Sequence, residues 1–273
     1  MNLLVLDKSL HCATTGTIMC ILQFVNNYRK QNNILIEKIS NIYIFKEDIV
    51  ASFNLIFDNT YNNEDVIKLI FSEKSKIEQV NYNNIYSDIE YQLLSKKIRF
   101  SKYVNDTINK EISYLDNNTL GVHFRFTDMN ASHSLYNQTN YDNYLIEILN
   151  FVKKYNITTI FIASDNNESI HKIINNNELK NIKFVYRDIK RYDKEKADNN
   201  DMIWYSNPNK NSPHLHLNNF KSKIFDINDP NIHFECIIDC ILLSKCSNLI
   251  FTYSNVSNLC ILLSDTILNK YKI

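Results

Sequence analysis

The stretch TLGVHFRFTDMN, residues 119–130, joins a run of strand-forming residues to a group of chargeable side chains. Its apolar part, LGVHFRF, predicts a buried strand. The strand contains Gly121, one of only two glycines in the chain, and leads into His123, Arg125 and Asp128. Because glycine suits a backbone that approaches a ligand closely, we expect Gly121 to help this strand carry its polar groups to a bound molecule.

Segments typical of strands and of helices alternate on both sides of this stretch. After it, strands are predicted at 158–164, 182–186 and 248–253, and helices at 141–156, 167–176, 231–246 and about 256–270. Before it, a strand at 3–6 is followed by a loop, a mostly apolar helix and two more strands, ILIEKI at 34–39 and NIYIF at 41–45. Strands that alternate with helices pair in parallel, through right-handed crossovers.

This alternation places the chain in the α/β class, with two doubly wound, Rossmann-like halves. Residues 89–115 predict one or two amphipathic helices, and the DNN at 116–118 predicts a turn that suits a domain boundary. The predicted domains are therefore an N-terminal half at 1–117 and a C-terminal half at 118–255, followed by a terminal helix at 256–273.

Composition and charge exclude several classes of protein. The 30 basic and 30 acidic residues leave no net charge, so a nucleic-acid partner is not expected. The N-terminus lacks the features of a signal peptide, and no run of about 18 uncharged apolar residues is present that would span a membrane. We therefore expect a cytoplasmic protein of a bacterium or of a virus-infected host cell. AT-rich codons explain its wealth of Asn, Ile, Lys and Tyr.

The six cysteines lie within apolar patterns and form no CxxC pair, so they are expected to be buried, free thiols. Cys236, Cys240 and His233 share one predicted helix and offer the alternative of a metal site, but no second pair of ligands accompanies them. Neither a resident metal nor a cofactor is therefore predicted.

Polar side chains gather where three of the predicted strands end. They are His123, Arg125, Thr127 and Asp128 after the first strand, Ser164, Asp165 and Asn166 after the second, and Thr252, Tyr253, Ser254 and Asn255 after the last. Since the carboxyl ends of parallel strands meet at one edge of a sheet, these groups are expected to line one crevice. The Arg125 guanidinium and the helix N-terminus at Asn255 would bind a phosphate there, and Asp165 would accept hydrogen bonds from a base or ribose.

Each of these residues also has an ordinary structural explanation. Arg125 suits a surface ion pair, Asp165 a turn or helix cap, and Ser254 the cap of the following helix. Gly16, in the first strand-to-helix connection, is equally typical of a loop or of the first turn of a helix, and no GxGxxG fingerprint accompanies it. The binding site is therefore predicted from the joint placement of the clusters rather than from any single residue.

The same clusters resemble, in the same order, the motifs of the GDP-fucose-dependent fucosyltransferases, which include α-1,6, α-1,2, protein O-fucosyltransferase and rhizobial nodulation groups. GVHFRFTD at 121–128 is similar to their GVHxRRxD motif, and IFIASDN at 160–166 to their strand that ends in Ser/Thr-Asp. DCILLSKCSNLIFTYSNVSNL at 239–259 resembles their third motif, and HCATTGTIMCILQFV at 11–25 more faintly resembles their N-terminal glycine loop. In one departure, Phe126 stands where the family has its second arginine.

The resemblance implies a GT-B fold, whose two Rossmann-like halves enclose a donor cleft, with 118–255 as the nucleotide-sugar-binding domain. It implies inverting, metal-independent transfer of fucose from GDP-fucose to a hydroxyl of a glycan acceptor. By the same resemblance Arg125 neutralises the departing β-phosphate, and His133 is a candidate catalytic base. The donor-binding residues that it implies are Gly16, His123, Arg125, Asp128, Asp165, Thr252, Ser254 and Asn255.

Other functions stay open at the level of sequence. The chain would alternatively be a non-catalytic nucleotide- or glycan-binding module, a glycosyltransferase with another nucleotide-sugar donor, or a different α/β enzyme of phosphorylated substrates, such as a phosphatase. The missing second arginine favours the first, whereas no recognisable nucleophile motif supports the last. The polar stretch at 187–229, with Trp204, His214 and His216, is expected to cover the site or hold an acceptor, or else to be a plain surface loop.

Overall fold

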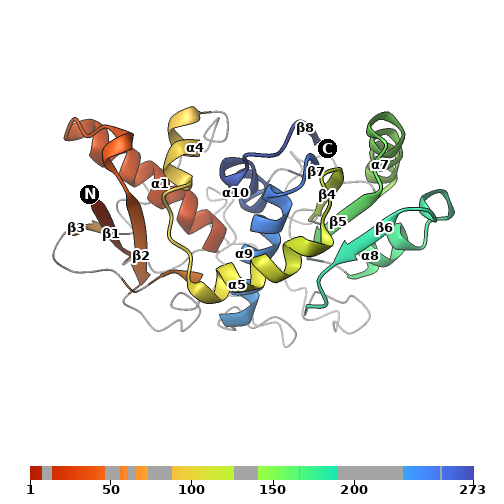
Figure 1. The fold of residues 1–273 in the computed structure, drawn as a ribbon, viewed down its shortest axis with the longest axis horizontal. Coiled ribbons are helices and arrows are strands. Elements are labelled where there is room, and N and C mark those ends of the chain that lie inside the picture. The colour runs from red at the N-terminus through yellow and green to blue at the C-terminus, as the bar shows by residue number, and fades with distance from the viewer. Residues whose placement is uncertain are drawn as a thin grey trace, which may run out of the picture. The chain divides into compact units, whose positions relative to one another are not determined.

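The structure of the protein is a computed structural model, and it describes residues 1–7, 14–46, 56–58, 60, 66–72, 88–125, 141–165, 167–189, 230–252 and 254–273. Within this part of the chain, strands alternate with helices and form two sheets (Figure 1). Every pair of neighbouring strands in these sheets is parallel. The α/β class with two Rossmann-like sheets, as predicted from the sequence, is therefore confirmed.

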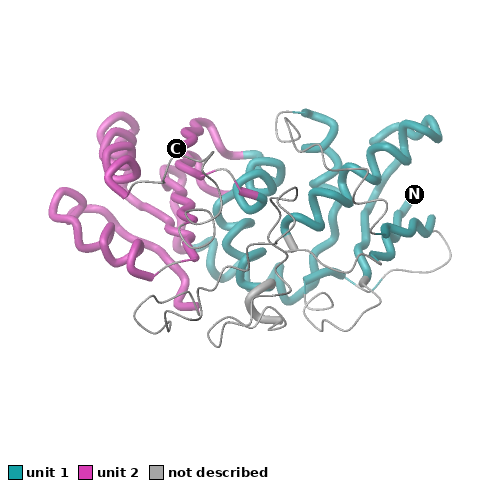
Figure 2. The backbone as a smooth tube through the Cα atoms, turned by 180° about the vertical axis from the view of Figure 1, so that it is seen from behind, with its two compact units in different colours: residues 1–113, 230–244, 255–265 teal, residues 114–229, 245–254, 266–273 magenta. Residues whose placement is uncertain are grey.

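The chain folds into two compact units, which Figure 2 colours separately. Unit 1 comprises residues 1–113, 230–244 and 255–265, and unit 2 comprises residues 114–229, 245–254 and 266–273. Each unit is built from segments that are far apart in the sequence. This division differs from the consecutive domains predicted at 1–117, 118–255 and 256–273, because two apolar helices from the C-terminal part of the chain belong to unit 1.

Unit 1 holds a three-stranded sheet with β1 (Asn2–Asp7) at its centre, between β2 (Asn41–Lys46) and β3 (Val66–Phe71). The middle residues of β1 are buried, as expected for a central parallel strand. Helix α1 (Thr14–Gln31) follows β1, and its apolar residues from Ile18 to Leu22 are fully buried. The opening strand and the apolar helix predicted from the sequence are thus confirmed.

The described part of unit 1 also contains the helices α4 (Ile89–Ser95), α5 (Lys102–Glu111), α9 (Pro230–Ser244) and α10 (Asn255–Leu263). The segment 89–115, predicted as one or two helices, forms both α4 and α5. Each begins with a side-chain cap: Asp88 accepts from the Glu90 N–H at 2.8 Å, and Ser101 accepts from the Val104 N–H at 3.2 Å. These caps explain why the amphipathic stretch is divided into two helices.

An ion-pair network ties the end of α1 to the start of α4. Glu90 binds Arg29 at 2.5 Å and Lys30 at 2.6 Å, both in the last turn of α1. Hydrogen bonds from Lys30 and from Arg29 lower the pKa of Glu90 to about 2. Arg29 is buried, and its Nε also donates to Oδ1 of Asn26 at 2.6 Å. These ion pairs therefore compensate the charge of the buried Arg29 guanidinium.

Unit 2 holds a five-stranded sheet in the order β6-β5-β4-β7-β8. Its strands are β4 (Thr119–Phe124), β5 (Thr159–Ser164), β6 (Lys183–Tyr186), β7 (Asn248–Phe251) and β8 (Asn269–Lys272). Counted from β4, this order is 3-2-1-4-5, which is the order of a Rossmann half, and it reverses between β4 and β7. Ligands of such sheets bind at this reversal, outside the carboxyl ends of the strands.

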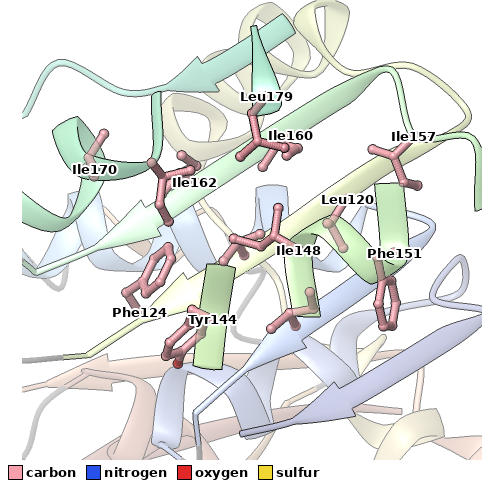
Figure 3. Close-up of a cluster of buried hydrophobic side chains, with 13 residues drawn as sticks. Leu120, Phe124, Tyr144, Ile148, Phe151, Ile157, Ile160, Ile162, Ile170 and Leu179 are labelled. Carbon is pink, nitrogen blue, oxygen red and sulfur yellow. The ribbon is translucent and has the colours of Figure 1, made fainter. Parts of the chain in front are cut away.

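The core of unit 2 lies between one face of this sheet and the helices α7 (Tyr141–Tyr155) and α8 (Asn167–Ile174). Side chains at alternate positions of the strands enter this core, because successive residues of a strand face opposite sides. The residues that meet there (Figure 3) include Leu120, Val122 and Phe124 of β4, Ile160 and Ile162 of β5, Ile250 of β7, and Tyr144, Ile148 and Phe151 of α7.

Two predictions of local structure are wrong. ILIEKI at 34–39 forms no strand, and its centre is the short 3-10 helix η1 (Ile36–Lys38). The buried residues there, Ile36 and Ile39, are three positions apart, a spacing that suits a helical turn. The terminal helix, predicted to about 270, ends at Leu263, where polar residues interrupt its apolar run, and the strand β8 follows.

Asparagine takes the usual place of glycine where two helices end. Asn33 after α1 and Asn156 after α7 have positive φ angles of 53° and 52°. At both ends the following N–H donates to the carbonyl five residues back, at 2.8 Å after α1 and at 3.1 Å after α7. This is the hydrogen-bond pattern of a Schellman cap, for which asparagine is the best substitute when glycine is scarce.

The turn at 116–118 anchors the start of β4 to the start of β5, which confirms the predicted turn. The Asp116 carboxylate accepts hydrogen bonds from the hydroxyls of Thr119 at 3.0 Å and Thr158 at 3.2 Å, and from the hydroxyl of Thr159. Partial burial disfavours the charge, but the hydrogen bonds, led by the one from Thr159, outweigh burial and hold the pKa of Asp116 below its usual value.

Asp116→Ala should lower the unfolding free energy by about 2 kcal/mol near neutral pH, because three hydroxyls lose a charged acceptor. The stabilisation belongs to the carboxylate, so the difference from wild type should shrink as the pH falls below the ordinary aspartate pKa of 3.8. Urea unfolding at several pH values measures both effects. Asp106→Ala, which removes an exposed carboxylate paired with Lys102, is the control and should cost less than about 1 kcal/mol. Equal losses in the two variants would contradict the anchoring role.

Candidate functional site

The carboxyl end of β4 lies between the carboxyl ends of β5 and β7 in unit 2. His123 stands directly opposite Ala163 of β5 and Phe251 of β7. The residues just beyond those strands, Asp165 and Thr252, therefore reach the same edge of the sheet as the end of β4. The structure thus brings together, within unit 2, the ends of the three strands whose polar residues the sequence singled out.

His123 faces away from the core shown in Figure 3. Phe124 points into that core, and its neighbour in the extended strand points to the opposite side of the sheet. His123 is only 5% exposed, whereas Arg125, the next residue beyond the strand, is partly exposed. Arg125 lies close enough for its charge to affect the titration of His123. The end of β4 therefore presents an imidazole together with a guanidinium.

Gly121 does not use the conformational freedom of glycine. It lies in the middle of β4, is buried, and has no positive φ. It stands opposite Phe161 of β5 and Leu249 of β7 in an undistorted register. The expectation that Gly121 lets the strand approach a ligand stays a prediction.

The pKa of His123 is lowered to about 3, mainly by burial and also by the positive charge of Arg125. An imidazole with this pKa is neutral near pH 7, so it supplies one N–H donor and one acceptor rather than a charge. The guanidinium of Arg125 keeps its charge and offers a planar fork that matches phosphate oxygens. The pair therefore suits an anionic ligand that also has neutral hydrogen-bonding groups.

Tyr144 of α7 joins these strand ends from the core side, and the sequence prediction missed it. Its side chain is fully buried, and its ring centroid lies 4.2 Å from that of Phe124. Its hydroxyl donates to the His123 carbonyl at 3.0 Å and is hydrogen-bonded to the Thr252 side chain. Burial raises the pKa of this hydroxyl, opposed by the hydrogen bond from Thr252 and reinforced by the charge of Asp165. A tyrosine at an apolar helix position was the available signal, since buried tyrosine hydroxyls usually find a partner.

The other predicted donor residues that the structure describes in unit 2 are Thr252 and Ser254 after β7, and Asp165 after β5. Thr252 and Ser254 are buried, and Asp165 is partly exposed. A carboxylate accepts hydrogen bonds only, so Asp165 suits a ligand group that carries N–H or O–H donors rather than a phosphate. Arg125 suits a phosphate and Asp165 suits a neutral polar group, so the two residues together match a ligand that has both parts.

Gly16 and Asn255 lie against each other within unit 1. Gly16 is the third residue of α1, which confirms the first-turn alternative, and its φ is not positive. A Cβ atom at Gly16 would stand 2.9 Å from Nδ2 of Asn255, the first residue of α10. The absence of a side chain at Gly16 thus allows the N-termini of α1 and α10 to approach. The first N–H groups of a helix have no partner within the helix itself, and together with the positive dipole ends they favour an anion nearby.

Two buried polar side chains of the described chain have no hydrogen-bond partner next to this contact. They are Thr17 of α1, through its hydroxyl, and Asn258 of α10, through both its amide oxygen and its amide nitrogen. Thr17 directly follows Gly16, and Asn258 lies one turn after Asn255 on the same face of α10. Unpaired buried polar groups cost about 1–3 kcal/mol each, so their presence beside two helix N-termini favours a role beyond packing.

Several predicted site residues lie outside the described residues. They are Asp128 and His133, together with Phe126, Thr127, Asn166, Tyr253, Trp204, His214 and His216. The donor role of Asp128 and the role of His133 as a base therefore stay predictions.

The cysteines that the structure describes are free thiols, as predicted, and Cys20, Cys240, Cys246 and Cys260 are buried. Cys240 Sγ donates to the Val256 carbonyl at 3.5 Å. Among the described residues, no group of three or more His, Cys, Asp or Glu side chains is arranged to hold a metal ion. Across the same part of the chain, no helix combines the length and hydrophobicity that crossing a membrane requires.

His123→Asn should weaken the acid dependence of stability. In the wild type the unfolded chain protonates His123 below about pH 6.5, while the folded chain resists protonation down to about pH 3, so the unfolding free energy falls on acidification within this window. The expected contribution is about 1.4 kcal/mol per pH unit. Urea unfolding between about pH 7 and pH 5 measures the slope. An unchanged slope in His123→Asn would contradict the low pKa.

Gly16→Ala tests the contact between α1 and α10. Alanine favours a helix over glycine by about 1 kcal/mol, but its Cβ must displace the Asn255 amide. We expect little or no gain in unfolding free energy in the wild type, and a gain of about 0.5–1 kcal/mol when the same change is made in an Asn255→Ala background. Thermal or urea unfolding of the four proteins of this cycle gives the coupling. Identical effects in the two backgrounds would show that the contact is not tight.

Comparisons with known proteins find structural likeness only. No protein-family model matches the sequence, and a search of curated proteins finds no match. A crystal structure of POFUT1 in complex with GDP is 13% identical over 98% of this chain and 72% of that chain, with a TM-score of 0.42. NodZ alpha-1,6-fucosyltransferase soaked with GDP-fucose is 10% identical over 96% of this chain and 92% of that chain, with a TM-score of 0.48. A mutant of Arabidopsis thaliana FUT1 in complex with GDP is 9% identical over 95% of this chain and 68% of that chain, with a TM-score of 0.49. The solved structures to which this chain is similar thus include an alpha-1,6-fucosyltransferase and two proteins in complex with GDP.

Proposed function

We propose that the protein is a glycosyltransferase that moves a sugar from a nucleotide-sugar donor, with GDP-fucose as the first candidate, to a hydroxyl of a glycan acceptor. The proposal rests on the two residues at the end of β4. There a neutral His123 and a charged Arg125 stand at the reversal of strand order, between the ends of β5 and β7. The choice of GDP and fucose comes from the resemblance of GVHFRFTD and the two later motifs to the fucosyltransferase motifs.

The proposed reaction is a displacement with inversion. The acceptor hydroxyl oxygen attacks the anomeric carbon from the face opposite the diphosphate and forms the new glycosidic bond. The bond between that carbon and the β-phosphate oxygen breaks, and its electron pair stays on the departing diphosphate. The guanidinium of Arg125 stabilises this developing negative charge, which makes a divalent metal unnecessary for the step. The hydroxyl proton passes to a general base, for which His133 is our candidate.

We propose that His123 acts neither as an acid nor as a base. With a pKa lowered to about 3, it is almost never protonated near pH 7 and accepts a proton only weakly. We assign it a neutral hydrogen bond that orients the donor beside Arg125. Asp165 would accept hydrogen bonds from the nucleoside, and Thr252 and Ser254 would contribute hydroxyls to the donor, as the sequence motifs imply.

The helix N-termini of unit 1 form a second group in this proposal. Gly16 lets α1 approach Asn255 at the start of α10, and two helix N-termini together favour an anion such as a phosphate. The unpaired, buried amide of Asn258 adds polar groups next to that anion-favouring position. We therefore propose Gly16 and Asn255 as donor-binding residues through the geometry of the two helices rather than through a glycine-rich loop.

A second candidate function is a non-catalytic nucleotide- or glycan-binding module, and one observation favours it. Phe126 replaces the second arginine of the family motif, so one positive charge for the departing phosphate is missing. Thermal-shift measurements with GDP, UDP, ADP and CMP distinguish a GDP-dependent protein from one with another donor. Selective stabilisation by GDP without turnover on any acceptor would favour the binding module. A cytoplasmic location stays part of the proposal.

Arg125→Ala should lower kcat/KM for the donor by about 100-fold or more, because the departing phosphate loses its cation. Arg125→Lys keeps the charge but loses the planar fork, so an intermediate loss is expected. Release of GDP from GDP-fucose, with and without a panel of glycan acceptors, measures the rates. Lys180→Ala removes an exposed positive charge before β6, at the opposite edge of the same sheet, and should leave activity unchanged. Full activity in Arg125→Ala would overturn the proposed mechanism.

A further inference from the structure

Tyr144 occupies an unusual position among the buried residues of unit 2. Most of its neighbours in the core are aliphatic side chains that need no polar partner, as Figure 3 shows. Its ring packs on Phe124, the last residue of β4, with an interplanar angle of 43°. The ring therefore contributes to the apolar core, while the hydroxyl comes to the end of the strand.

The hydroxyl of Tyr144 contacts one residue of β4 and one residue just after β7. It has a single proton, and that proton goes to the His123 carbonyl at 3.0 Å because a carbonyl can only accept. Its oxygen is then left to accept from the Thr252 hydroxyl, which is hydrogen-bonded to it. The charge of Asp165, which follows β5, also affects the titration of this hydroxyl. One buried hydroxyl thus joins the ends of β4 and β7.

The contacts of the Tyr144 hydroxyl lie where the pairing of the strands ends. The ladder between β4 and β7 ends at the pair His123 and Phe251, and that between β4 and β5 ends at the pair Phe124 and Ser164. Thr252 and Asp165 come one residue later, where ladder hydrogen bonds no longer fix the backbone. The contact from the core therefore helps to continue the alignment of β4 and β7 beyond their paired residues.

We propose that Tyr144 is a positioning residue whose hydroxyl holds the ends of β4 and β7 in the mutual arrangement that the donor requires. The inference rests on the proposed function for the identity of the ligand, a nucleoside diphosphate, but not for the positioning itself. Tyr144 is fully buried on the core side of the sheet. It acts through His123 and Thr252, and through His123 on the placement of Arg125, which follows two residues later.

The same helix provides a matched control. Tyr141, one turn before Tyr144, also donates its hydroxyl to a backbone carbonyl, that of Lys172 at 2.8 Å. Its acceptor lies in α8 rather than at a strand end. Tyr144→Phe and Tyr141→Phe therefore each remove one hydroxyl and one hydrogen bond from α7 to a distant carbonyl, but only the first change affects the strand ends.

Hydrogen–deuterium exchange without any nucleotide tests the positioning. In Tyr144→Phe the amides of residues 123–125, 252 and 254 should exchange about tenfold faster than in wild type, while those at the start of β4, 119–121, should keep their rates. Tyr141→Phe should leave all of these amides unchanged. Unchanged exchange at the strand ends in Tyr144→Phe, or equal acceleration in both variants, would overturn the inference.

GDP binding tests the consequence for the ligand. Calorimetry should give a Kd for GDP about tenfold higher in Tyr144→Phe and unchanged in Tyr141→Phe, as expected for a group that orients ligand-binding residues. If wild type bound no nucleotide, the proposed function would fail, and the exchange measurement would still decide the positioning role. A GDP Kd equal to that of wild type in Tyr144→Phe would overturn the link to the donor.

Thr252→Val gives an independent route should Tyr144→Phe fold poorly. The change keeps the shape of Thr252 and removes the hydroxyl that donates to Tyr144. It should speed exchange at 123–125 as Tyr144→Phe does, and the double variant should show no further acceleration, because both changes break one hydrogen-bonded unit. Thr252→Ser, which keeps the hydroxyl, should restore wild-type exchange. If the accelerations of exchange in the two single variants multiplied in the double variant, Tyr144 and Thr252 would not act as one hydrogen-bonded unit.

Discussion

The parallel register that holds β4 between β5 and β7 determines where each polar group at this edge of unit 2 lies. In this register His123 stands opposite Ala163 and Phe251, and Phe124 turns into the core. A shift of the register by one residue would exchange the two faces of β4, bury Arg125 and bring the aromatic ring to the ligand side. The Asp116 turn at the amino end and the Tyr144 hydroxyl at the carboxyl end both act on this register, one at each end of the strand.

The electrostatic character of the site follows from that arrangement. Burial keeps His123 uncharged, so the positive charge of this pair at the end of β4 is that of Arg125. Arg125 is only partly exposed, and there its attraction for a phosphate would be stronger than in bulk water. In unit 1 the positive potential has another source, two helix N-termini that approach because Gly16 has no side chain.

The sequence predicted most of unit 2 because its periodicity is strong there. The segments TLGVHF, TIFIAS and NLIF all form parallel strands, and the helix predicted at 141–156 agrees with α7 to within a residue. β8 was missed because NKYK is polar and exposed, and it is a strand only through pairing with β7. The sequence does not distinguish a strand from a helical turn in ILIEKI, because four apolar residues in six fit the two-residue period of a strand as well as the period of a helix. The contacts of Gly16 with Asn255 and of Tyr144 with His123 join residues far apart in sequence, and no local pattern in a single chain encodes them.

The asparagine caps of α1 and α7 link the fold to the base composition of its gene. Glycine codons begin with two guanines and asparagine codons with two adenines, so a gene rich in A and T encodes many asparagines and few glycines. Left-handed helix ends are positions where asparagine takes the place of glycine at little cost, because it tolerates a positive φ better than most residues. The two glycines of the chain lie elsewhere, in a helix contact and in the central strand of unit 2. At Gly16 the obstacle to a side chain is a neighbouring atom rather than a backbone angle, so asparagine would not fit there as it does at a helix end.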